Sequence, residues 1–212
     1  MRLVTRLIGR DKVLPTGRVR NASRLTHRKK MDTTLRKATD DDRRLIKNLV
    51  PYYIYDMSGP MGWDPNAEGL YDGCDELPEY WKKPDHHPYV ITVDGRIGGF
   101  AMVRPYPGEL ERTEIGELFV LRKFQGHGVG TISAFKLFDA HPGQWLVRVL
   151  NGNTGARGFW QKVIEAYTDG RFTHSAEQYL CQHSGVWPMQ FYRFESRIQP
   201  AEASAHHSAG DP

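Results

Sequence analysis

The sequence has very little cysteine and no long apolar run. Cys74 and Cys181 are the only cysteines among its 212 residues, and they show none of the close pairing that metal sites require. No stretch approaches the roughly 18 apolar residues of a membrane helix, and the N-terminus lacks the apolar core of a secretory signal. We therefore expect a cytoplasmic protein without a metal site and without a membrane partner.

Basic residues are concentrated at one end of the chain. Residues 1–30 hold ten of the 29 Lys and Arg residues but one of the 25 acidic residues, so the rest of the chain carries a net charge of about −5. Such an arm could bind nucleic acid through its phosphates, or serve as an organelle transit peptide. Met31 is an alternative start of translation, and we favour the interpretation that residues 1–30 are a translated upstream stretch without a role. We therefore do not expect nucleic acid as a partner.

Hydrophobic periodicity predicts a mixed α/β fold with one continuous sheet. Asp94-Gly95 lies between two β-rich runs and predicts a hairpin turn, and Gly98-Gly99 predicts a bulge or a close approach. Tyr80 and Trp81 are the expected buried anchors of the region 62–84. The expected elements are a strand at 33–38, a helix capped by Asp40 that ends near Pro51 and continues or bends up to Gly59-Pro60, strands at 89–93, 96–103 and 114–121, a helix at 130–140, a strand at 145–150, a helix at 156–163 and strands at 177–183 and 190–196.

The run Gln125-Gly126-His127-Gly128-Val129-Gly130 carries the strongest chemical signal. It joins a strand to a helix, and a helix N-terminus presents unsatisfied N–H groups and partial positive charge to an anion. Glycine lets the backbone approach phosphate oxygens, so a pyrophosphate is the expected ligand. The run lacks the Gly-Lys-Ser/Thr of a P-loop and the G-x-G-x-x-G spacing of a dinucleotide fold. A plain tight turn remains the alternative at this point.

Two motifs in the right order resemble one known family. Gln125-x-x-Gly128-x-Gly130 is similar to the coenzyme A-binding motif of the GNAT N-acetyltransferase superfamily, and Asn153-x-x-Ala156-x-x-Phe159 is similar to its second motif. The stretch from Leu35 to Asp42 resembles the usual first strand and helix start. The resemblance covers about residues 33–197 and is weakest over 58–88. It implies a single domain, with a mostly antiparallel sheet splayed at the cofactor strand and flanked by helices.

The resemblance implies acetyl-CoA as the cosubstrate and direct transfer of its acyl group to an amine. Carried over to this sequence, the cofactor contacts are the backbone around Leu118, Phe119 and Val120, the turn residues Gln125, Gly126, His127, Gly128, Val129 and Gly130, the Thr131 hydroxyl, and Asn153 and Phe159. His127 is expected to face solvent or the pyrophosphate rather than the reacting amine.

The chain departs from the family where a tyrosine often protonates the leaving thiolate. Trp160 stands there, and its indole N–H can donate a hydrogen bond but cannot act as an acid; we favour a core role for it. Val163-Ile164 replaces the usual Gly-Phe. Tyr167, Tyr192 or water could supply the proton, and Tyr192 is our candidate.

Glu117 is the candidate general base, because it lies on the strand that would expose the thioester. Alternation along the strand could equally place it on the solvent face, and Glu114 is the second choice. The predicted substrate wall comprises Tyr52, Tyr53, Tyr55 and Asp56, with an aromatic core stripe as the equal alternative. We interpret His86-His87 as a loop rather than a metal site.

The predicted function is N-acetylation of an amine on a small molecule or a protein. The acidic body favours a cationic acceptor through electrostatic steering. The alternative is a non-catalytic acyl-CoA-binding or regulatory module, which the missing tyrosine motivates. We expect the acetyltransferase domain to span 31–198 and residues 199–212 to be disordered; the sequence allows a homodimer and leaves the acceptor open.

Overall fold

A computed structural model describes residues 31–71, 77–181 and 185–196. The predictions for the basic extension, for Cys74 and for the C-terminal tail lie outside these residues. Within the described part of the chain, no helix is both long and apolar enough to cross a membrane.

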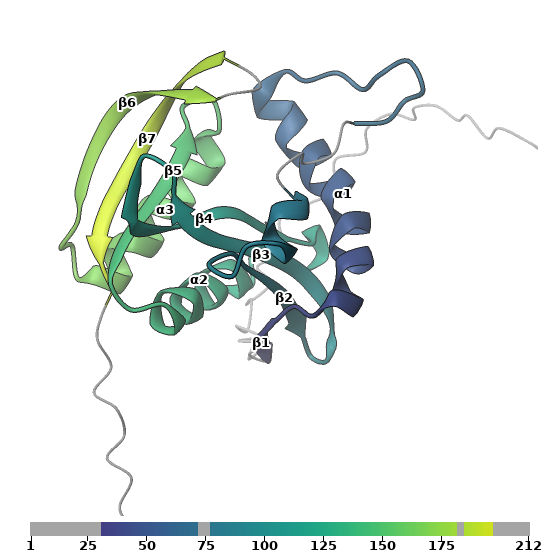
Figure 1. The fold of residues 1–212 in the computed structure, drawn as a ribbon, viewed down its shortest axis with the longest axis horizontal. Coiled ribbons are helices and arrows are strands. Elements are labelled where there is room, and N and C mark those ends of the chain that lie inside the picture. Colours follow the sequence, from purple (N-terminus) through teal and green to yellow (C-terminus); the bar gives the residue numbers. More distant parts are fainter. Residues whose placement is uncertain (1–30, 72–76, 182–184, 197–212) are drawn as a thin grey trace, which may run out of the picture.

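Seven strands form one sheet with the order β1-β2-β3-β4-β5-β7-β6 (Figure 1). Neighbouring strands are antiparallel except β4 and β5, which are parallel. The predicted α/β class and mostly antiparallel sheet are therefore confirmed. The strands are β1 (Thr33–Lys37), β2 (His87–Val93), β3 (Arg96–Tyr106), β4 (Glu109–Val120), β5 (Gln144–Leu150), β6 (Thr173–Cys181) and β7 (Gly185–Glu195).

Helices cover both faces of the sheet. The helical elements are η1 (Asp40–Asp42), α1 (Arg43–Met61), η2 (Leu77–Trp81), η3 (Arg122–Phe124), α2 (Val129–Ala140) and α3 (Thr154–Thr168). Alternation along β3 separates the two layers: Phe100 and Met102 pack under α1, whereas Ala101 and Val103 pack under α2 and α3. Tyr80 of η2 is buried in the α1 layer, as predicted, and Trp81 packs against that layer while partly exposed.

The first helix continues past Pro51, one of the two outcomes that the sequence allowed. It runs one residue beyond the predicted stop at Gly59-Pro60, to Met61, where Gly62 adopts a left-handed conformation and ends it. An interior proline costs a helix about 3 kcal/mol, and burial of the apolar face on both sides of Pro51 offsets that cost. At the N-terminus Thr39, rather than Asp40, precedes the first turn, because Asp42 accepts the Thr39 backbone N–H at 2.9 Å.

The hairpin between β2 and β3 forms as predicted. Asp94 and Gly95 have φ values of 48° and 72°, the positive pair that a type I′ turn requires. Gly98-Gly99 produces both expected features, because the register shifts there and a Cβ on Gly99 would lie 1.9 Å from the Phe119 carbonyl oxygen.

The parallel strands β4 and β5 part almost as soon as they meet. They pair at Thr113–Trp145 and Glu114–Leu146, and within the described residues no ladder pair joins them further along. Glu114 is 1% exposed and accepts hydrogen bonds from Arg104 Nε of β3 at 2.8 Å and from Arg148 Nε of β5 at 2.9 Å. This buried carboxylate joins three strands at the point where the gap begins.

A second polar cluster, which is partly buried, lies at the end of α2. His141 Nε2 is 2.7 Å from the Tyr89 hydroxyl, and the His141 ring stacks on His87 at 4.8 Å between centroids. Burial, with smaller contributions from His87 and Lys37, lowers the pKa of His141 from 6.5 to about 4. The folded protein therefore holds this imidazole neutral at pH values where the unfolded chain protonates it.

We predict that His141 makes the fold acid-sensitive. Because the unfolded state binds the proton more readily, the free energy of unfolding should fall as the pH drops from about 6.5 towards 4 and level off below 4. Chemical denaturation of His141→Gln, which keeps an acceptor for Tyr89, should show a shallower decline. His127→Gln removes an exposed imidazole and should follow the wild-type profile; a His141→Gln profile identical to wild type would contradict the assignment.

Candidate functional site

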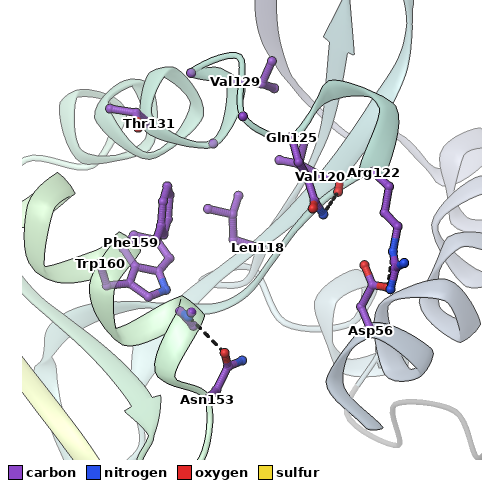
Figure 2. A pocket seen from close by; sticks show the side chains of 15 residues that line it. Asp56, Leu118, Val120, Arg122, Gln125, Val129, Thr131, Asn153, Phe159 and Trp160 are labelled. Atoms are coloured by element: carbon purple, nitrogen blue, oxygen red, sulfur yellow. Dashed lines mark hydrogen bonds and ion pairs between the residues drawn. The ribbon is translucent and has the colours of Figure 1, made fainter. Parts of the chain in front are cut away.

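A cavity of about 940 Å³ lies beside the gap between β4 and β5. Figure 2 shows that β4, the glycine turn with α2, the start of α3 and the second half of α1 surround it. The lining residues are Asp56, Leu118, Val120, Arg122, Gln125, Gly126, Gly128, Val129, Gly130, Thr131, Asn153, Gly155, Ala156, Phe159 and Trp160.

The glycine turn ends one strand and begins a helix. Gln125 Nε2 donates to the Val120 carbonyl at 2.8 Å, which ties the turn back to the end of β4. Gly128 has φ 82° and is the N-cap of α2. The first N–H groups of a helix have no acceptor within it, so those of Val129 and Thr131 are available to an anion in the cavity.

The second motif forms the opposite wall. The Asn153 side chain caps α3 by accepting the Ala156 N–H at 2.9 Å, and its amide nitrogen lies 3.4 Å from Met57 Sδ of α1. A Cβ on Gly130 would lie 3.1 Å from Phe159 Cζ, so the glycine lets this ring pack against the first turn of α2. The two motifs are thus brought into contact by packing.

Most of the predicted cofactor residues line this one cavity, with two exceptions. Phe119 packs on the other side of β4, in the layer under α1. His127 is exposed, and its Nδ1 lies 2.7 Å from the Gln125 carbonyl oxygen. The predicted contacts found in the lining are Leu118, Val120, Gln125, Gly126, Gly128, Val129, Gly130, Thr131, Asn153 and Phe159.

The aromatic candidates for proton donation lie in different places. Trp160 both lines the cavity and belongs to the core, where its ring meets Phe159 edge to face. Tyr192 is 1% exposed, stacks on His174, and is absent from the lining; burial raises the pKa of its phenol. Tyr167 is buried in the core, and its hydroxyl donates to the exposed residue Asp139 at 2.7 Å. Within the described residues, no tyrosine lines the cavity.

Glu117 faces α1 rather than solvent. Alternation places it with Phe119 on the side of β4 away from Leu118, and the Tyr53 hydroxyl donates to its carboxylate. The second choice of base, Glu114, is fixed between Arg104 and Arg148.

The predicted substrate wall divides into three parts. Tyr53 packs against Phe100 and Phe119, and Asp56 lines the cavity. Tyr52 and Tyr55 are 61% and 57% exposed, so a purely buried aromatic stripe is wrong for these two residues.

The two adjacent histidines, His86 and His87, contact different residues. His86 Nδ1 lies 2.7 Å from Asp85, whereas the ring of His87 stacks on His141. In the described ranges, no three His, Cys, Asp or Glu side chains are grouped so that they could hold a metal ion.

Sequence reasoning missed Arg122, which lines the cavity just before the glycine turn. Its Nε and Nη2 lie 2.9 and 2.7 Å from Asp56 Oδ1, and Figure 2 shows the pair facing each other from η3 and α1. A basic residue three positions before a phosphate-type turn was the available signal. Nothing in the sequence indicated that Arg122 pairs with Asp56, which lies 66 residues away.

The sheet, the gap and the cavity that both motifs line are the features that the resemblance to GNAT N-acetyltransferases implies. A sequence profile of the Acetyltransferase (GNAT) family matches residues 52–164, more than half of the chain. The chain belongs to this family, whose cosubstrate is acetyl-CoA. A search of curated proteins found no match.

Solved structures resemble the whole fold at low sequence identity. Ribosomal-protein-S18-alanine N-acetyltransferase from Escherichia coli has a TM-score of 0.52 and 12% identity, over 81% of this chain and 98% of that one. YncA, a putative acetyltransferase from Salmonella typhimurium solved with its cofactor acetyl-CoA, has a TM-score of 0.51 and 17% identity over the same shares. An acetyltransferase from Thermus thermophilus has a TM-score of 0.52 and 19% identity, over 77% and 96%. These likenesses show the fold.

We predict that Gly128→Glu abolishes acetyl-CoA binding measured by isothermal titration calorimetry. A Cβ at this position meets no protein atom, so the carboxylate would extend into open space at the turn and repel phosphate. The positive φ adds backbone strain of about 1–3 kcal/mol. Gly170→Glu is the matched control, because Gly170 has a φ of 77° with equally open space but follows α3 away from the cavity. Equal loss of binding in both variants would show that strain alone is responsible.

Proposed function

We propose that this chain transfers the acetyl group of acetyl-CoA directly to an amine of a small molecule or a protein. The observation that carries the proposal is the single cavity that both family motifs line, beside the gap where β4 and β5 part. Bound acetyl-CoA would supply a thioester as the acyl donor and a thiol as the leaving group.

The residues of the cavity fit such a cosubstrate. The N–H groups at the start of α2 and the glycines before it suit a pyrophosphate, and the Thr131 hydroxyl adds a donor. Among the residues that the structure describes, the gap beyond Glu114 leaves the β5-facing edge of β4 without a partner strand near Leu118 and Val120, which suits the amide-bearing pantetheine arm. Phe159 and Asn153 would flank that arm from α3.

The acceptor would approach from the α1 side of β4. Asp56 lines the cavity there, and a carboxylate favours an amine that arrives as a cation. Glu117 lies on this same side of β4, in contact with Tyr53. Glu117 and Tyr53 lie outside the lining of the cavity, so we assign Glu117 as the base that takes the amine proton through a water molecule, with Tyr53 and Asp56 as acceptor contacts.

The departing sulfur must gain a proton, and the cavity supports water as its source. Tyr192 and Tyr167 are both buried outside the lining. Trp160 does line it, and its indole N–H can polarise a thiolate by donating a hydrogen bond without giving up its proton. We therefore assign the proton to water, assisted by Trp160, because Tyr192 is buried away from the cavity.

Release of free coenzyme A tests this function. With acetyl-CoA and a panel of diamines, polyamines, amino acids and peptides with free α-amino groups, the wild type should release thiol with at least one acceptor. Glu117→Gln should lower kcat at neutral pH by about a hundredfold, the lower end of the contribution of a general base, with little change in acetyl-CoA affinity.

Glu111→Gln is the matched control, because Glu111 is an exposed carboxylate of the same strand; it should retain wild-type kcat. Tight acetyl-CoA binding without thiol release for any acceptor would instead support a non-catalytic binding module. Full activity of Glu117→Gln would remove that residue from the mechanism.

A further inference from the structure

The ion pair between Asp56 and Arg122 joins the two sides of the proposed active site. Arg122 directs two nitrogens at one oxygen of Asp56, at 2.9 and 2.7 Å. The Arg122 side chain is 73% exposed and that of Asp56 is 23% exposed, and the guanidinium carbon lies 6.0 Å from the centroid of the Tyr55 ring. Both residues line the cavity, so the pair is part of the ligand site.

The pair holds opposite charges beside a site that suits an anion. The turn at Gln125–Gly130 presents N–H groups to phosphate, and a bare carboxylate in the same cavity would repel a polyanionic ligand. Arg122 neutralises Asp56 through their ion pair. Among the lining residues of the cavity, Arg122 carries the full positive charge, and it lies three positions before the turn.

The geometry of Arg122 allows it to change partners. A guanidinium binds phosphate at least as well as carboxylate, with the same planar fork of donors. An exposed ion pair contributes little free energy, and most of the Arg122 side chain is in solvent. A ligand with several phosphate charges can therefore outcompete Asp56 for this side chain.

We infer that the Asp56–Arg122 pair is an electrostatic latch that the anionic cosubstrate opens. Binding of coenzyme A phosphates would draw Arg122 away from Asp56 and into contact with the ligand. The exchange would leave the Asp56 carboxylate without its present cation while the cosubstrate is bound. This inference rests on the proposed function, since it takes coenzyme A as the ligand of the cavity.

The latch can be tested by measuring the affinity of coenzyme A for two variants of the full chain, with all measurements made at the same ionic strength. Asp56→Asn frees Arg122 and removes a repelling charge, so it should tighten binding by about two- to fivefold, the scale of an exposed ion pair. Arg122→Gln removes the phosphate contact and exposes Asp56, so it should weaken binding by about tenfold. Lys123→Gln removes the neighbouring positive charge, which lies over Phe124 and outside the lining, and should change affinity less than Arg122→Gln.

The exchange itself can be followed through the Arg122 Nε–H resonance in a ¹H–¹⁵N spectrum, assigned by its absence in Arg122→Gln. Coenzyme A should shift this resonance in the wild type, and Asp56→Asn should already shift it in the free protein. If the wild type binds coenzyme A, any of three results would overturn the latch but keep the cosubstrate site. These are an Arg122 resonance that does not shift, affinities of both variants equal to that of the wild type, or weaker binding by Asp56→Asn than by the wild type. Absence of coenzyme A binding by the wild type would overturn the proposed function itself.

Discussion

One buried carboxylate joins three strands at the point where the gap in the sheet begins. Glu114 holds Arg104 of β3 and Arg148 of β5, and the parallel ladder between β4 and β5 has its last pair at this residue. Arg148 is further held against Tyr179, with 4.0 Å from its guanidinium carbon to the ring centroid. Removing one partner from a buried ion pair costs about 3–5 kcal/mol because the other charge stays buried. The strands are thus fixed at the start of the gap and separate beyond it.

The same contacts that complete the fold also shape the cavity. Gln125 uses its amide to close the turn on Val120, Asn153 caps α3, and Gly130 makes room for Phe159. Each of these residues belongs to a family motif and has a structural role in the described chain without any ligand.

Sequence reasoning succeeded where the cause of the structure is local. Asp94-Gly95 sets its own turn through positive φ values, and the glycine turn and the start of α2 follow from neighbouring residues. It left open or missed the features that depend on contacts between residues far apart in the sequence. Packing against the sheet decides that α1 continues past Pro51, where the sequence allowed a continuation or a bend. Contact with the α1 layer decides which way Glu117 faces, which the sequence left open. The Asp56–Arg122 pair, which the sequence did not reveal, joins residues 66 positions apart. The position of Tyr192 in the core depends on the pairing of β7 with β5 and β6, which no local pattern reveals.

We propose that one cavity, formed where β4 and β5 part, binds acetyl-CoA through the turn before α2. A crystal structure of the full chain with coenzyme A bound tests this most directly. We predict the pyrophosphate at the backbone N–H groups of residues 126–131, with the pantetheine arm passing Leu118 and Val120 towards Asn153. Coenzyme A bound elsewhere on the protein, with the turn at Gly128 making no contact with phosphate, would contradict the account.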